Sequence, residues 1–97
     1  MVLLMDPNRL VARRYILSGR VQGVGFRYFA ERAARATGVA GWARNLDDGR
    51  LEVYASGTRP QLEEFESRLR SGPPRADIRG FEAAEAAPLD AQGFSIR

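Results

Sequence analysis

Two stretches with helical periodicity, each entered from a β-prone or capping segment, set the order of elements along this chain of 97 residues. In the first, small and apolar residues recur every three or four positions and predict one buried helix face, formed by Phe26, Phe29, Ala30, Ala33, Ala34 and Thr37. Gly38 ends that helix in the position that tolerates a left-handed backbone. The second helix is predicted after Thr58, which has the capping-box spacing to Gln61, with Pro60 in the first turn. Its buried stripe is Leu62, Phe65 and Leu69.

Short β-prone segments surround these helices, at residues 13–18, 41–46, 50–55, 78–84 and 94–97. Residues 47–49 (Asp-Asp-Gly) predict a tight hairpin between the second and third segments. In the third segment Leu51, Val53 and Ala55 alternate with Arg50, Glu52 and Tyr54. Alternate residues of a strand point to opposite faces, so the first set is predicted on the buried face and the second on the outward face. The order β-α-β-β-α-β, with an extra strand at the end, predicts an α+β ferredoxin-like fold with two helices on one face of a mostly antiparallel sheet. That fold hosts many functions and decides none of them.

Three residue types are missing, and their absence narrows the possible chemistry. The chain has no Cys and no His, and all 15 of its basic residues are Arg. Thiol nucleophiles, disulfides, imidazole bases and Schiff-base lysines are therefore excluded. No metal site and no cofactor are expected, and any catalysis must use the remaining polar side chains or the main chain.

The net charge of +3 conceals two unlike halves. Residues 1–44 contain eight Arg and two acidic residues, a net charge of +6, whereas residues 45–97 contain seven Arg and ten acidic residues, a net charge of −3. The basic half indicates an anionic partner. The exclusive use of Arg is equally consistent with a GC-rich genome.

The first residues predict an appendage and no membrane anchor. Residues 1–5 are apolar but too few for a signal-peptide core or a bilayer span, and turn-forming residues follow them. We predict a flexible N-terminal extension at 1–12, a domain at 13–97, a cytoplasmic location and no membrane partner.

The segment from the first strand to the first helix is the candidate binding site. Gly23 and Gly25 permit close main-chain approach, and the helix start at Phe26 offers unpaired N–H groups and a positive dipole end. Together they predict a cradle for one phosphate group, with Arg27 placed to fold over it. The dinucleotide fingerprint and the nucleotide P-loop both fail here. The alternative is that the glycines only shape a tight strand-to-helix turn.

Asn45 is the second candidate, at the end of the second strand. Its amide could hold a water molecule beside a bound phosphate by donating one hydrogen bond and accepting another. It could also simply start the hairpin turn, because Asn favours turns. Arg20 and Arg44 flank the two segments, either as steering charges or as solvated surface charges.

The two segments resemble both signature motifs of the acylphosphatase family. These are residues 19–27 (Gly-Arg-Val-Gln-Gly-Val-Gly-Phe-Arg) and residues 41–51 (Gly-Trp-Ala-Arg-Asn-Leu-Asp-Asp-Gly-Arg-Leu), followed by Gly57. The resemblance covers residues 13–97, and it departs from the family only at Leu51, where Val is frequent, and in the N-terminal extension.

The resemblance implies metal-independent hydrolysis of an acyl phosphate to carboxylate and orthophosphate. It implies that Arg27 binds the phosphoryl group with the loop amides of Gln22, Gly23, Val24, Gly25 and Phe26. It also implies that Asn45 orients the attacking water. We also predict that the protein is a monomer. The competing hypotheses are an RNA-binding module and a domain without turnover. Residues 79–81 (Arg-Gly-Phe) begin like an RNA-recognition motif, but Glu82 and Ala83 break it, so no nucleic-acid partner is expected.

Overall fold

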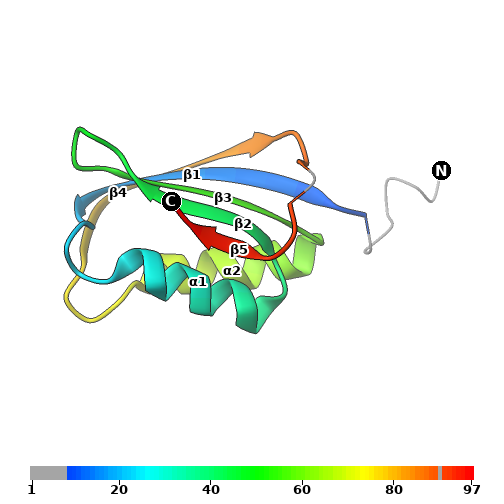
Figure 1. Ribbon diagram of the computed structural model, residues 1–97, viewed down its shortest axis with the longest axis horizontal. Helices are drawn as coiled ribbons and strands as arrows, with labels where there is room; N and C mark the ends of the chain where they lie inside the picture. The colour runs from blue at the N-terminus through cyan, green and yellow to red at the C-terminus, as the bar shows by residue number, and fades with distance from the viewer. Residues whose placement is uncertain (1–8, 90) are drawn as a thin grey trace.

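Two helices lie side by side on one face of a five-stranded sheet (Figure 1), in a computed structural model that describes residues 9–89 and 91–97. The elements in chain order are β1 (Val11–Arg20), α1 (Phe26–Thr37), β2 (Ala40–Asn45), β3 (Leu51–Gly57), α2 (Arg59–Ser71), β4 (Asp77–Ala86) and β5 (Phe94–Ile96). The strand order is β4-β1-β3-β2-β5, antiparallel throughout except for β5, which pairs parallel to β2. The predicted ferredoxin-like fold and its extra last strand are confirmed.

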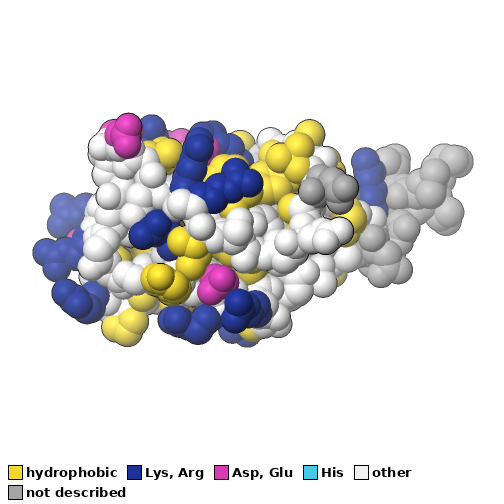
Figure 2. All heavy atoms as spheres, in the orientation of Figure 1, with side chains coloured by type: hydrophobic (Ala, Val, Ile, Leu, Met, Phe, Trp, Pro, Cys, Tyr) yellow, Lys and Arg dark blue, Asp and Glu magenta, His cyan; other side chains and the backbone are white. Residues whose placement is uncertain are grey.

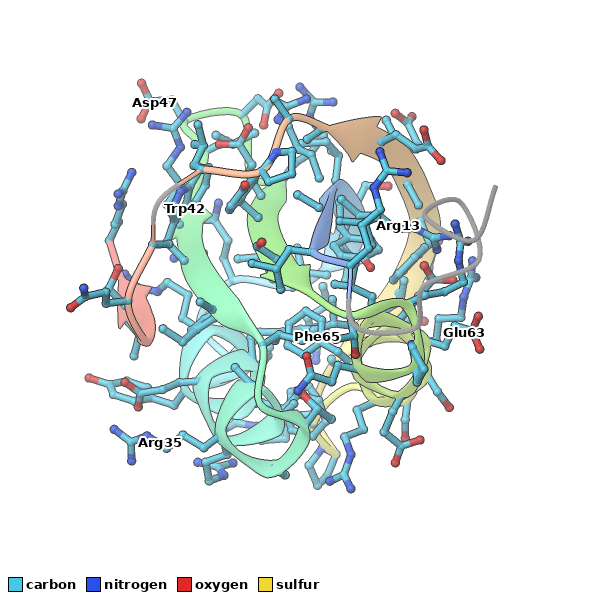
Figure 3. All side chains as sticks on the ribbon, turned by 90° about the vertical axis from the view of Figure 1, so that its right-hand side faces the viewer. Arg13, Arg35, Trp42, Asp47, Glu63 and Phe65 are labelled. Atoms are coloured by element: carbon cyan, nitrogen blue, oxygen red, sulfur yellow. The ribbon has the colours of Figure 1, made fainter. Side chains whose placement is uncertain are left out.

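The helices pack where their periodicity predicts. Four of the six residues predicted for the buried face of α1 are buried, namely Phe26, Ala30, Ala33 and Ala34, whereas Phe29 and Thr37 are only partly buried. On α2 all three predicted residues, Leu62, Phe65 and Leu69, are buried. Phe65 lies between α2 and the sheet (Figure 3) and contacts the rings of Tyr15 and Phe94. The small residues Ala30, Ala33 and Ala34 let α1 pack closely against β2 and β5.

The helices differ at their first turns. Thr58 and Gln61 form the predicted capping box of α2, since Gln61 N donates to Thr58 Oγ1 (3.4 Å) and Thr58 N donates to Gln61 Oε1 (2.9 Å). Helix α1 follows Gly25 and has neither a side-chain cap nor an acidic residue in its first turn. The N–H groups that begin α1 are therefore available to a ligand.

The residues of β3 alternate between the two faces of the sheet as predicted, but neither face is outward. All seven residues of β3 are buried, including Glu52 and Tyr54 on the face turned away from the helices. Tyr54 is covered because its hydroxyl donates to Ala87 O (2.9 Å) and accepts from Leu89 N (2.6 Å) in the β4–β5 connection. A central strand is screened by its neighbours, and no pattern within the strand itself reports that.

The predicted extension falls largely outside the structure. Residues 1–8 lie outside the described residues, so flexibility there stays a prediction, whereas Val11 and Ala12 already belong to β1. Among the described residues no helix is long and apolar enough to cross a bilayer.

Candidate active site

The loop between β1 and α1 has the geometry of an anion cradle. Gly23 and Gly25 adopt left-handed conformations, with φ of 72° and 78°, and a Cβ on either residue would meet no atom within 4 Å. The glycines are therefore required by the backbone conformation, and the space beside them is open. The helical ladder starts with Phe29 N donating to Gly25 O (3.0 Å), so the amides of Phe26 and Arg27 precede it.

Gln22 ties this loop to the β2–β3 hairpin. Its side-chain Nε2 donates to Leu46 O (2.8 Å) and to Arg50 O (3.0 Å), the two residues that close the hairpin. Leu46 directly follows Asn45, so Gln22 fixes the end of β2 beside the cradle. The sequence predicted a role for the Gln22 main-chain amide and did not predict this tether.

Arg27 is half-buried in the first turn of α1 and reaches across to the end of β5. Its Nη1 donates to the main-chain oxygen of Arg97 (3.0 Å), and Arg97 N in turn donates to Ala43 O on β2 (2.8 Å). A guanidinium carries five N–H donors, and no other partner of Arg27 is recorded among residues 9–89 and 91–97. Most of its donors are therefore free for an anion.

Asn45 ends β2 on the same side of the sheet as Ala43, because alternate residues of a strand share a face. Ala43 is fully buried under the helices, so Asn45 faces the helix layer at the end where α1 begins. Its Oδ1 is buried and has no hydrogen-bond partner within the described part of the chain. An unpaired buried amide oxygen is costly, and it is a place where a donor such as water would be held.

A cluster on the opposite face of the sheet supports this end of β2. Arg14 and Arg44 both donate to the buried Glu52 carboxylate, Arg44 Nε at 2.5 Å. Burial alone would raise the pKa of Glu52, but these two hydrogen bonds outweigh it and hold the pKa below its usual value. Trp42 lies under the guanidinium groups of Arg44 (5.3 Å) and Arg97 (4.8 Å). The side chain of Arg97 is thus held by Trp42 while its main chain holds Arg27.

The structure brings the predicted site residues to one end of the molecule, where the β1–α1 loop and the β2–β3 hairpin meet (Figure 1). Arg97 was not among the predicted residues. It lies 70 positions from Arg27 in the sequence, and no spacing rule relates the two. No group of three His, Cys, Asp or Glu residues that could hold a metal ion occurs within the described ranges.

The ferredoxin-like sheet, the glycine-shaped loop, the uncapped start of α1 and the unpaired donors of Arg27 define the class of the protein, an α+β domain with a candidate anion site. The family model named Acylphosphatase matches residues 13–96. An acylphosphatase of Solibacter usitatus is 54% identical over 86 residues, covering 89% of this chain and 90% of the relative. One from Archaeoglobus fulgidus is 44% identical over 87 residues, covering 90% and 98%. The crystal structure of acylphosphatase from Bacillus subtilis superposes with a TM-score of 0.86 at 39% identity, covering 90% of this chain and 98% of that one.

The chain belongs to the acylphosphatase family, and it is an enzyme that hydrolyses acyl phosphates. The predicted family, enzyme class and general reaction are confirmed.

Proposed function

We propose that Arg27 and the main-chain amides of residues 22–26 bind the phosphoryl group of the acyl phosphate, and that Asn45 orients the water that attacks it. The observation that carries this proposal is the uncapped start of α1 beside an arginine with free donors, in contrast to the start of α2, which has a capping box. Main-chain N–H groups and a guanidinium fork are the strongest phosphate ligands that a chain without Lys and His can offer.

In the proposed reaction, water oxygen attacks phosphorus as the bond from phosphorus to the acyl oxygen breaks. The acyl oxygen leaves as a carboxylate, a weak base that needs no general acid. Negative charge spreads over the phosphoryl oxygens, where Arg27 and the loop amides stabilise it. The proton of the water passes late to an oxygen of the transferred phosphate.

Asn45 suits the role of a water holder because its buried Oδ1 has no protein partner within the described residues. An amide can accept a hydrogen bond from the water through Oδ1 and so fix its direction. Because the water is already oriented, the attack has a smaller entropic cost. The tether from Gln22 to Leu46 sets the separation between this amide and the cradle.

The test is steady-state hydrolysis of benzoyl phosphate by three variants, with EDTA present throughout. Arg27→Ala is expected to lose roughly 10³-fold or more in kcat/KM. Arg27→Lys is expected not to restore it, because an ammonium cannot reproduce the planar fork. Asn45→Ala is expected to lose kcat while inorganic phosphate still inhibits as in the parent enzyme.

Arg32→Ala is the matched control, since Arg32 is an exposed arginine on the same helix and its loss changes the net charge equally. Turnover by Asn45→Ala near the parent rate would refute the water-holding role. Loss of turnover in EDTA would refute metal independence. A monomeric state, a cytoplasmic location and the absence of a nucleic-acid partner stay predictions, and light scattering tests the first of them.

A further inference from the structure

A second basic feature lies beside the cradle and takes no part in the proposed chemistry. It is a hollow of about 640 Å³ lined by Gly19, Arg20, Arg75, Asp77 and Arg79, which we call the basic hollow. All three arginines are exposed. Arg79 pairs with Asp77 (Nε to Oδ2, 3.1 Å), whereas Arg20 and Arg75 have no carboxylate partner among the residues that the structure describes. The basic hollow therefore carries a net charge of +2.

The hollow is built by close strand packing. The β1–β4 register shifts between Ser18 and Gly19, directly before Arg20. A Cβ on Gly19 (φ 108°) would lie 2.2 Å from Asp77 O and 2.8 Å from Arg79 N, so only glycine lets β4 come this near. Bulges of this kind re-aim side chains and are frequent next to active sites.

The basic hollow adjoins the cradle in sequence and in space. Arg20 is separated from Gln22, the first cradle residue, by Val21 alone, so its Cα lies within about 11 Å of that of Gly23, the full reach of three residues. The segment after α2 packs on the first residue of α1, since a Cβ on Gly72 would contact the ring of Phe26 at 3.3 Å. Basic side chains gather at this end of the molecule in the space-filling view, at the left of Figure 2.

We propose that the basic hollow is a leaving-group subsite, which binds a second anionic group on the acyl part of the substrate. The inference rests on the proposed function, because it takes the phosphoryl group to lie in the cradle. A substrate whose acyl group carries a carboxylate or phosphate several bonds from the reacting phosphorus would contact both places. Small acyl phosphates such as acetyl phosphate would reach only the cradle. The enzyme therefore prefers acyl phosphates whose acyl group carries an anionic substituent, and the preference resides in Arg20, Arg75 and Arg79.

The test compares two substrates with one reaction centre, benzoyl phosphate and 4-carboxybenzoyl phosphate, whose rigid ring holds the second charge away from phosphorus. Arg75→Gln is expected to lower kcat/KM for 4-carboxybenzoyl phosphate about threefold to fivefold, the effect of one exposed ion pair, through KM. Its kcat/KM for benzoyl phosphate is expected to stay unchanged. Arg75→Glu is expected to widen the difference to about tenfold or more because it also repels the carboxylate.

Arg59→Gln is the matched control, an exposed arginine at the start of α2 that lines a different hollow. Equal losses on both substrates, or equal effects of Arg59→Gln and Arg75→Gln, would show that these arginines act only through the general field and would overturn the proposal. Free terephthalate added to the benzoyl phosphate assay separates a tethered group from a free anion. Terephthalate is also the product released from 4-carboxybenzoyl phosphate, so it is expected to inhibit competitively, and less so in Arg75→Gln. An Arg75-dependent rise in kcat with free terephthalate would indicate an effector site and would overturn the proposal.

The measurement is a ratio between two substrates on one enzyme. Failure of the proposed function would appear as full activity in Arg27→Ala or Asn45→Ala, and failure of the subsite would appear as an unchanged ratio in Arg75→Gln. The two failures are distinguishable.

Discussion

Replacing Gln22 by Met tests whether the tether between the cradle loop and the hairpin positions the catalytic groups. Met has nearly the length of Gln and cannot donate, so Gln22→Met removes the hydrogen bonds to Leu46 O (2.8 Å) and Arg50 O (3.0 Å) with little change of shape. Each such bond contributes about 0.5–1.5 kcal/mol net, and the second is exposed, so we expect a loss of about 1–2 kcal/mol. For a domain of this size that lowers Tm by roughly 5–10 °C.

The effect on turnover should exceed the effect on stability. If the end of β2 drifts from the cradle by about 1 Å, the loss in rate can reach roughly 10²-fold, and we expect at least a tenfold fall in kcat for benzoyl phosphate. Inhibition by inorganic phosphate should change less, because the loop amides and Arg27 stay in place. Calorimetry and steady-state kinetics on Gln22→Met are to be compared with Gln92→Met, the same change at an exposed residue of the β4–β5 connection. A lowered Tm with unchanged kcat would refute the positioning argument, and no change in either would refute the tether.

Three further predictions concern the core residue Tyr15, the buried Glu52 and the cradle residue Gly25. The Tyr15 hydroxyl is buried with no partner in the described part of the chain, so Tyr15→Phe should leave the free energy of unfolding in urea unchanged or raise it. Burial raises the pKa of Tyr15 to about 12, from about 10 when unfolded. The folded state therefore keeps its full stability below pH ~10 and loses stability as the pH rises through ~12, and Tyr15→Phe should lack that loss. The pKa of Glu52 is held low by Arg14 and Arg44 against the effect of burial. The stabilisation from the ionised carboxylate is therefore present above the unfolded pKa of about 4.3 and lost as the pH falls further. In urea unfolding from pH 7 to pH 3, the free energy of unfolding should decline less for Glu52→Gln than for the parent. Gly25→Ala places a Cβ on a left-handed residue (φ 78°) and should lower the free energy of unfolding by about 1–2 kcal/mol and weaken inhibition by phosphate, and unaltered urea midpoints would contradict this.

Local signals carried most of the fold. The bounds of α1, the capping box at Thr58 and the hairpin before Leu51 each depend on residues a few positions apart, and the structure has all three. The burial of Glu52 and Tyr54 depends instead on Arg14, Arg44 and the β4–β5 connection, which the chain brings to β3 only on folding.

The site divides in the same way. The cradle loop and Asn45 stand in two compact motifs, so the sequence was sufficient to locate them, and their roles stay proposals. The hydrogen bond of Arg27 to Arg97 joins residues 70 positions apart. The two hydrogen bonds of Gln22 to the hairpin join residues more than 20 positions apart. The first contact forms because β5 pairs parallel to β2, and the second because the hairpin lies against the loop. Neither arrangement produces a periodic pattern in the sequence.

The unequal beginnings of the two helices have a consequence for how the enzyme responds to what it binds. At the start of α2 the side chains of Thr58 and Gln61 already accept hydrogen bonds from main-chain N–H groups. Helix α1 has no such side chain, so an oxyanion that accepts hydrogen bonds from its first amides would act as a removable cap and stabilise the folded state. Orthophosphate at a hundredfold excess over its dissociation constant should raise the free energy of unfolding by about 2.7 kcal/mol, and Tm should rise with it. A Tm that does not change with orthophosphate would show that no such anion binds at the start of α1.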